Sequence, residues 1–235
     1  MRTRTLATTV GVAIVLAGLA VPAHAALQLQ LSTGGSSQTI TDGGFMDLCP
    51  LAGCITFVGM VGGSTLNLTT GTSKPLAGPA DLTLNSVDIS GVAGQTLTIA
   101  LSDTDFVSPA PDGPGLSLLQ RLTALSLPGT ATVSAQGYQS NSNTAFDLSG
   151  GTSGAAVVDN SNPFASVNGD PLTAIAPYSL TEVAQITFGR AGIVQFNADL
   201  ALSPEPGGLV LVGGVLIVIS RAFRTRTRTR SSQSS

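Results

Sequence analysis

The chain has 235 residues, of which 43% are hydrophobic, 4% aromatic and only 10% charged, with 28 glycines and no tryptophan. Average globular proteins carry about 25% charged residues, and helices place many of them on their exposed faces, so this composition excludes a mostly helical domain and favours short strands joined by turns. Between residues 26 and 203, twelve acidic residues outnumber three basic ones, which excludes nucleic acid as a partner.

The first 25 residues have the parts of a secretory signal peptide. Two arginines open the chain, and an apolar run extends to Val21. Ala23 and Ala25 then supply the small-x-small pattern that signal peptidase requires. We therefore expect a signal helix over residues 1–25 with cleavage after Ala25. An uncleaved anchor helix is the alternative, although the apolar run is short for one.

Alternation of apolar and polar residues predicts strands along most of residues 26–203. The clearest alternating stretches are 27–31, 65–69, 82–89 and 97–101, and glycines separate them at intervals of about 8 to 15 residues. No long helical pattern interrupts them. The sequence therefore predicts an all-β fold, a single antiparallel β-sandwich that is jelly-roll-like, outside the cytoplasm.

The chain has two cysteines, Cys49 and Cys54, on either side of a short turn. Export places them in an oxidising compartment, so we expect them to form a disulfide. Redox catalysis or metal binding is the weaker alternative, because the spacing is not Cys-x-x-Cys and no histidine can assist.

Three carboxylates lie close together in the middle of the chain, on Asp103, Asp105 and Asp112. Oxygen-rich loops of this kind bind Ca²⁺, but the spacing is not that of an EF-hand and no glutamate stands at the required distance. Two interpretations remain: a solvated turn after a strand, or a weak Ca²⁺ site. No other metal or cofactor is expected.

Residues 116–127 fit either a helix with leucines on one face or a strand. A Pro-Gly pair follows at 128–129, and residues 130–138 alternate like a strand. This favours a hairpin of 118–127 with 130–139.

Residues 144–170 are rich in Gly, Ser and Asn and are expected to form a long surface loop. The alternating stretches 179–188 and 193–202 follow, separated by Gly-Arg-Ala-Gly. They predict a second hairpin at the end of the domain.

The C-terminus has three parts in a fixed order. Pro204, Glu205 and Pro206 end the last predicted strand, and residues 207–220 then carry no charge. As a transmembrane helix this run would span about 21 Å, short of the ~30 Å hydrocarbon core. Positive residues that flank a membrane segment stay in the cytoplasm, so the domain itself lies outside. The flanking cluster consists of Arg221, Arg224, Arg226, Arg228 and Arg230.

This ordered tail resembles the PEP-CTERM sorting signal of Gram-negative bacteria. The stretch from Tyr178 to Leu200 is also similar to the final strands of many members. Two features depart from the pattern: Ser203 stands where valine is usual, and threonines alternate with the arginines before a serine-rich end. Both departures leave the three parts in place. An ordinary stop-transfer anchor is the alternative.

The resemblance implies a route and a set of partners. An exosortase, a membrane-bound cysteine transpeptidase, would process the protein near the Pro-Glu-Pro motif after a transient stay in the inner membrane. The product would reach the cell surface or the medium, where members of this family associate with exopolysaccharide and biofilm matrix. The expected organisation is a signal peptide at 1–25, an extracytoplasmic domain at 26–203, a sorting signal at 204–230 and a disordered tail at 231–235.

The domain has few residues for catalysis. The only histidine, His24, leaves with the signal peptide, so no histidine can act as a base or as a zinc ligand. Glu182 is the only glutamate of the domain, and no spacing singles out a carboxylate pair for a glycosidase. We therefore expect a non-enzymatic surface or matrix protein. A secreted carbohydrate- or Ca²⁺-binding module is the alternative, although few aromatic residues could stack on sugars, and a secreted hydrolase ranks third.

Overall fold

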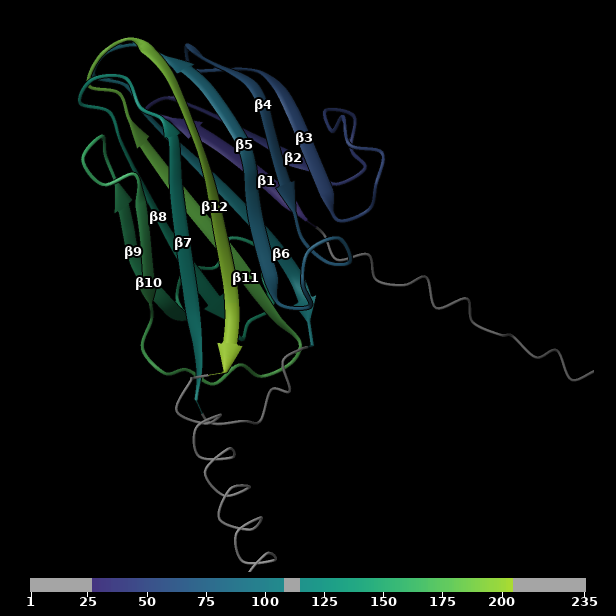
Figure 1. Cartoon of the computed structure of the whole chain (residues 1–235). Helices are drawn as coiled ribbons and strands as arrows, with labels where there is room; N and C mark the ends of the chain where they lie inside the picture. Colours follow the sequence, from purple (N-terminus) through teal and green to yellow (C-terminus); the bar gives the residue numbers. More distant parts are fainter. Residues whose placement is uncertain (1–26, 108–114, 205–235) are drawn as a thin grey trace, which may run out of the picture.

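The computed structural model describes residues 27–107 and 115–204, and the regular structure in this part consists of β-strands (Figure 1). No helix in this part is long and apolar enough to cross a membrane. The predicted signal helix with its cleavage site, most of the sorting signal and Asp112 lie outside the described residues.

The strands form two six-stranded antiparallel sheets. Sheet A has the order β2-β1-β6-β11-β8-β9, and sheet B has the order β10-β7-β12-β5-β4-β3. The strands of sheet A are β1 (Gln28–Thr33), β2 (Ser36–Thr41), β6 (Thr96–Phe106), β8 (Thr132–Ser140), β9 (Gly151–Val158) and β11 (Tyr178–Thr187). The strands of sheet B are β3 (Cys54–Val61), β4 (Ser64–Thr72), β5 (Asp81–Gly91), β7 (Leu116–Ser126), β10 (Phe164–Asn168) and β12 (Gly192–Pro204). The predicted all-β, antiparallel fold is thereby confirmed.

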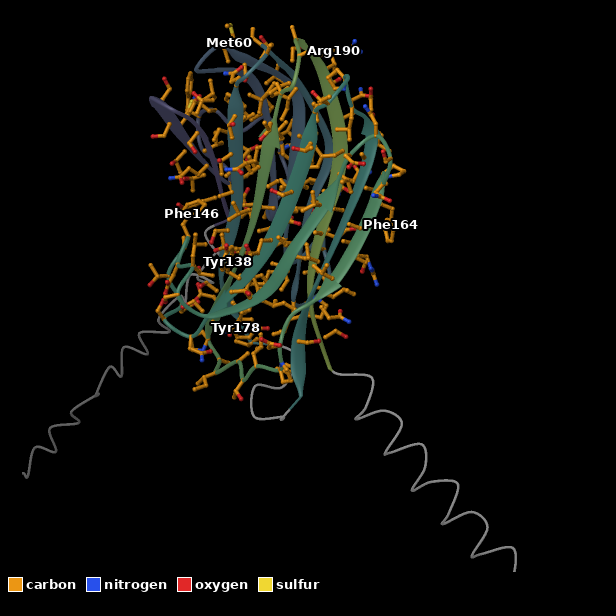
Figure 2. The ribbon with its side chains drawn as sticks, turned by 90° about the vertical axis from the view of Figure 1, so that its left-hand side faces the viewer. Met60, Tyr138, Phe146, Phe164, Tyr178 and Arg190 are labelled. Carbon is orange, nitrogen blue, oxygen red and sulfur yellow. A yellow bond between two sulfur atoms is a disulfide. The ribbon has the colours of Figure 1, made fainter. Side chains whose placement is uncertain are left out.

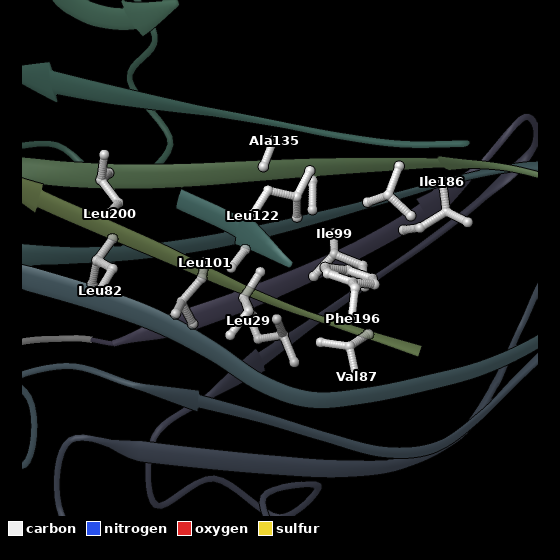
Figure 3. Packing of buried hydrophobic residues seen from close by; sticks show 14 of the residues in the cluster. Leu29, Leu82, Val87, Ile99, Leu101, Leu122, Ala135, Ile186, Phe196 and Leu200 are labelled. Carbon is white, nitrogen blue, oxygen red and sulfur yellow. The ribbon is translucent and has the colours of Figure 1, made fainter. Parts of the chain in front are cut away.

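One hydrophobic core lies between the two sheets (Figure 3). Alternate residues of each strand point into it, so Leu29 and Ile99 of sheet A pack against a cluster that includes Leu82, Phe196 and Leu200 of sheet B. These side chains are fully buried. Burying one such side chain contributes about 1.5–3 kcal/mol to stability, so the alternation read from the sequence is also the main source of the fold's stability.

Strands β5 to β12 pair in a nested order. β5 pairs with β12, β6 with β11, β7 with β10, and β8 with β9. The chain therefore crosses between the sheets at most connections. The first four strands widen this unit: β1 and β2 extend sheet A beyond β6, and β4 and β3 extend sheet B beyond β5.

Both predicted hairpins are wrong, although the strands themselves are correct. Residues 116–126 form a strand rather than a helix, but β7 belongs to sheet B and β8 to sheet A. β11 and β12 are likewise in different sheets. In each case the chain turns across the core instead of along the sheet. The alternation of apolar and polar residues determines which face of a strand is buried. Two strands that face each other across the core show the same alternation as two strands paired in one sheet, so the pattern cannot distinguish the two arrangements.

The predicted surface loop at 144–170 is also wrong, because it contains β9 and β10. β9 pairs with β8 and β10 pairs with β7, at the far edges of the two sheets. The inward residues of these strands are small or few, for example Ser153 and Ala156 on β9. A weak apolar signal of this kind does not distinguish an edge strand from a loop.

The two ends of the sandwich differ in character (Figure 1). One end, which we call the tip pole, has the short connections at 34–35, 62–63, 92–95, 127–131, 159–163 and 188–191. The opposite end, the loop pole, has the longer segments 42–53, 73–80, 141–150 and 169–177. The described chain also enters and leaves there, since Gln28 pairs with Ser102 late in β6 and Pro204 pairs with Leu116 at the start of β7.

Candidate functional site

Pro204 is the one residue of the predicted sorting motif that the structure describes. It ends β12 and pairs with Leu116 on β7. The remaining motif residues, Glu205 and Pro206, and the arginine cluster follow outside the described part. The predicted sorting signal at 204–230 would thus begin at the residue where β12 ends.

The predicted disulfide between Cys49 and Cys54 is confirmed, with 5.8 Å between the two Cα atoms. It closes a loop that caps the outer edge of β3. The carboxylate of Asp47 accepts a hydrogen bond from the amide of Thr56 at 3.0 Å, and the amide of Leu48 donates to the carbonyl of Thr56 at 2.8 Å. Thr56 thus finds the partners that a neighbouring strand would otherwise supply.

Asp103 is fully buried, and its carboxylate has partners from the chain itself. Lys74 donates to it at 2.9 Å and the hydroxyl of Ser73 donates at 2.5 Å. The ammonium of Lys74 also lies 3.8 Å from the centre of the Phe106 ring, which stacks on Tyr178. The contacts of Ser73 and Lys74 hold the segment 73–80 against β6. The Asp103 carboxylate can be buried because the Lys74 ammonium supplies the opposite charge beside it.

Asp105 has a different partner from Asp103. Its amide donates to the side chain of Asn143, whose own amide returns a bond to the Asp105 carboxylate, both at 2.7 Å. Within the described residues no group of three potential ligands is placed to hold a metal. Weak Ca²⁺ binding by Asp103, Asp105 and Asp112 stays a prediction, because Asp112 lies outside the described part.

The Asp147 carboxylate organises part of the loop pole, and the sequence pattern does not single it out. Asp147 accepts hydrogen bonds at 2.6 Å from the hydroxyls of both Ser140 and Ser142, and another from the amide of Ser149. These donors hold the pKa of Asp147 well below its usual range. The segment 141–150 also covers one end of sheet A, because the amide of Phe146 donates to the hydroxyl of Ser102 at 2.9 Å (Figure 2).

A second missed group lies in the core. Glu182 of β11 and Gln120 of β7 are both 0% exposed, and the Gln120 amide donates to the Glu182 carboxyl group at 2.6 Å. Burial is the main reason that the pKa of Glu182 rises to about 8. The alternating pattern places Glu182 on the inward face of its strand, but only the fold shows what meets it there.

The outer face of sheet B is charged. Arg121, Asp81 and Asp199 lie near one another there, on β7, β5 and β12. Partial burial is the main cause that raises the pKa of both aspartates; the charge of Asp199 raises that of Asp81 further, and Arg121 opposes both shifts. These interactions make the face polar and partly neutralised, with an excess of negative charge.

The outer face of sheet A is uncharged across the six described strands. Strand register places the outward residues in continuous rows, such as Gln30, Ala100, Val183 and Gln136. Hydroxyl and amide groups dominate, and each can both donate and accept hydrogen bonds. Three of the outward positions, Ala100, Ser102 and Thr181, are nevertheless buried. The other outward residues are Ser37, Thr39 and Thr41 on β2; Gln28, Gln30 and Ser32 on β1; Thr96 and Thr98 on β6; Val183, Gln185 and Thr187 on β11; Thr132, Ser134, Gln136 and Tyr138 on β8; and Thr152, Ala155 and Val157 on β9.

An open polar cleft of about 560 Å³ lies at the tip pole, next to this face. Gln95 joins two of its walls, since its side chain donates to the carbonyl of Gly62 at 2.8 Å and accepts from the amide of Val92. Gly62 has a φ of 51°, and a Cβ there would lie 1.9 Å from the Thr33 hydroxyl, so only glycine fits. The cleft is lined by Thr33, Gly34, Gly35, Ser36, Gly62, Gly94, Gln95 and Thr96.

Comparison with known proteins does not place the chain in a family. No family model matches it, and no curated protein matches it. Among solved structures, the enzymatically active domain of tailspike protein 4 from bacteriophage CBA120 is similar to 69% of this chain, with 12% identity and a TM-score of 0.33. The chain spans only 20% of that structure, and a likeness this distant supports no inference about activity.

Proposed function

We propose that the protein is an exported, non-enzymatic component of the cell surface or extracellular matrix, released from the inner membrane through its C-terminal sorting tail. The Cys49–Cys54 disulfide carries this proposal, because disulfides persist in oxidising compartments outside the cytoplasm. Signal peptidase would act after Ala25, and an exosortase would act near Pro204, Glu205 and Pro206.

The lack of histidine in the domain and the burial of two of the acidic residues support a non-enzymatic role. The domain has no histidine after signal cleavage. Glu182 is enclosed in the core, and Asp103 is held by Lys74 and Ser73. A hydrolase needs carboxylates that face a substrate and water, whereas these two face other parts of the same chain.

The mass of the mature protein tests the sorting route. We expect material from wild-type cells to start after Ala25 and to end near Pro206, and material from exosortase-deleted cells to keep the full tail. Replacing Pro204 and Pro206 by alanine in wild-type cells should reproduce the second result. If wild-type protein still carries residues 209–235, the tail is a permanent anchor and the route is wrong.

The nested pairing supports the finer fold assignment that the sequence suggested. Pairing β5 with β12, β6 with β11, β7 with β10 and β8 with β9 is the order expected for two Greek keys wrapped as a jelly roll. We infer that β5–β12 form a jelly-roll-like unit and that β1–β4 are an N-terminal extension of both sheets.

A second candidate function is binding of a neutral, hydroxyl-rich polymer such as a polysaccharide. The uncharged outer face of sheet A favours it, because rows of hydroxyl and amide groups about 4.8 Å apart match the alternating donors and acceptors of sugar chains. The open cleft at the tip pole extends the same chemistry beyond the sheet. Hydrogen bonds rather than aromatic stacking would supply the affinity, since Tyr138 is the one aromatic residue among the outward positions.

A matched pair of charge substitutions tests this candidate. Gln185→Lys changes an exposed residue on the outer face of sheet A, and Ser166→Lys changes an exposed residue on the opposite face. In pull-downs with neutral polysaccharides, we expect Gln185→Lys to weaken binding at least several-fold and Ser166→Lys to leave it unchanged. Equal effects of the two substitutions, or no binding by the wild-type protein, would exclude this face as a polysaccharide site.

A further inference from the structure

The contact between Gln120 and Glu182 joins the two sheets through the middle of the core. Gln120 belongs to sheet B and Glu182 to sheet A, and both side chains are fully buried. The neighbouring strand positions are apolar or lack a side chain, since Glu182 pairs with Leu101 on one side and Gly137 on the other. A polar contact enclosed in this way must satisfy its own hydrogen bonds.

The orientation of the Gln120 amide follows from its surroundings. Its nitrogen lies 3.1 Å from the carbonyl oxygen of Asp199 and 3.2 Å from that of Arg121. Carbonyl oxygens only accept hydrogen bonds, so the amide nitrogen, not the oxygen, must face them. The same nitrogen donates to Glu182 at 2.6 Å. The positions of the nitrogen and of the oxygen are therefore both determined.

Two oxygen atoms of this pair are then left without a partner among the described residues: Oε1 of Gln120 and Oε2 of Glu182. They belong to two planar groups that one hydrogen bond already joins. An ionised carboxylate only accepts, so it cannot help the amide oxygen, whereas a protonated carboxyl group donates one hydrogen bond. A single proton on Glu182 therefore provides a donor for Gln120 and uses both unpartnered atoms.

We propose that Glu182 is a neutral carboxylic acid that forms a reciprocal pair of hydrogen bonds with Gln120, and that this pair acts as a pH-sensitive clasp between the two sheets. While the proton is present, each group donates one hydrogen bond and accepts one. Once it is lost, the amide oxygen has no donor and a negative charge is enclosed in the core. The clasp therefore holds at acid and neutral pH and opens in alkali.

The charges around the pair favour the neutral form. Burial raises the pKa of Glu182 to about 8, the hydrogen bond from Gln120 lowers it by less, and the charge of Asp199 raises it further. Gln120 and Glu182 lie on β7 and β11, whose paired strands are β6, β8, β10 and β12, with β5 next to β12. The titratable residues nearest to it along those elements are Asp103 with Lys74 beside β6, Tyr138 on β8, Arg121 on β7, Asp199 on β12, Asp81 on β5, and Tyr178 on β11 itself.

The chain offers a direct test, because it has only two glutamates, Glu182 and Glu205. Full-length protein labelled with ¹³C at the glutamate side-chain carboxyl gives one NMR signal for each, and Glu205→Gln identifies which is which. We expect the Glu182 signal to titrate near pH 8. A Glu182 signal that titrates below pH 6 would overturn the proposal.

A conservative variant separates the clasp from burial alone. Glu182→Gln replaces the acid by an amide, and two amides can form the same reciprocal pair without a titrating proton. This variant should fold and keep the protection of core amides from hydrogen exchange unchanged between pH 6 and pH 9, whereas the wild-type protein loses protection on β7 and β11 above pH 8. Equal pH dependence in the two proteins would show that the clasp does not exist. If Glu182→Gln does not fold, the NMR titration of the wild-type protein decides alone.

Discussion

Glu182 gives the folded protein an unusual dependence on pH. Its pKa is about 8 in the folded state, against 4.5 for a free side chain. Between these values the unfolded chain has lost the proton and the folded chain keeps it, so rising pH favours unfolding. The contribution of Glu182 is complete below about pH 4.5 and is lost progressively as pH rises towards 8. A carboxyl group whose pKa is lowered in the folded state has the opposite effect, because its contribution to stability is lost as pH falls. Asp147 is such a group.

Urea unfolding of the wild-type protein and of Glu182→Gln at several pH values measures this effect. We expect the difference between their unfolding free energies to change by up to ~1.4 kcal/mol per pH unit within the window. The wild-type protein should lose stability relative to the variant from pH 5 to pH 8. A constant difference across this range would show that Glu182 titrates normally in the folded state.

The buried pair of Lys74 and Asp103 predicts an order of effects. Lys74→Met leaves the Asp103 carboxylate 0% exposed without its countercharge, and breaking a fully buried pair in this way costs ~3–5 kcal/mol. Since the Lys74 side chain is 24% exposed, we expect about 2–3 kcal/mol. Asp103→Asn should cost less, because Lys74 still contacts the Thr104 carbonyl, the Phe106 ring and water. Urea unfolding of both variants checks the order, and the reverse order would contradict this account.

At the residue scale, sequence reasoning succeeded where chemistry is local. Cys49 and Cys54 could be paired because they are the only cysteines and lie close in the chain. Asp103 stands out in the sequence as one of three nearby carboxylates. Its partner Lys74 lies 29 residues away and is brought to it only by the fold. The same holds for Glu182 and Gln120, which are 62 residues apart. Alternation predicts that such a residue points inward, not what it meets there.

At the scale of elements, strands β8 and β12 illustrate how closely the two sheets pack. Gly137 on β8 lies opposite Leu200 on β12, and a Cβ at position 137 would be 2.0 Å from the nearest Leu200 carbon. Gly137→Ala should therefore destabilise the protein by about 1–3 kcal/mol through overpacking. Thermal or urea unfolding measures the loss.

A double variant tests whether Leu200 is the cause. Leu200→Ala alone leaves a cavity and costs ~2–5 kcal/mol. Combined with Gly137→Ala, the added methyl group enters the space that Leu200 vacates, so the double variant should lose less than the two single losses together. Strictly additive losses would place the strain elsewhere.

The disulfide loop makes a prediction for the edge of sheet B. Replacing Cys49 and Cys54 by alanine removes the constraint on a loop with a sequence separation of 5, which the chain-entropy model values at about 2 kcal/mol. The cap formed by Asp47 and Leu48 should loosen at the same time. Hydrogen exchange at the Thr56 amide should become faster, while exchange at Leu84, in the interior of sheet B, should follow only the global change. Unchanged protection at Thr56 would mean that the cap holds without the disulfide.

The strands were easier to predict than the strands they pair with. Both predicted hairpins, β7 with β8 and β11 with β12, fail for the same physical reason. A strand's period reports burial on one face, which is why the strong patterns of β1, β4, β5 and β6 were found. It carries no information on whether the next strand joins the same sheet. β9 and β10 were missed for a different reason: their inward side chains are small or half-buried, so the period is weak. The uncharged face of sheet A could not be predicted from the sequence, because its rows of residues depend on which strands are neighbours in the sheet.

At the scale of the whole molecule, the two poles have different surroundings if the C-terminal tail holds the protein at a membrane before processing. The chain leaves the described domain at Pro204, on the loop pole, and the polar cleft lies at the tip pole. β7, with 11 residues, runs between the poles, a distance of about 35 Å at ~3.3 Å per residue. The cleft and the turns around it should therefore face away from the lipid.

Fluorescence quenching by lipids with a spin-labelled head group can measure this orientation in vesicles that contain the unprocessed chain. The native cysteines are bonded to each other, so Ser161→Cys at the tip pole and Thr173→Cys at the loop pole each introduce a single thiol for a dye. Both positions are exposed. Since head-group quenching is short-ranged compared with the length of the domain, we expect strong quenching at position 173 and little at position 161. Equal quenching at the two sites would show that the domain lies flat, with the tip pole as close to the lipid as the loop pole.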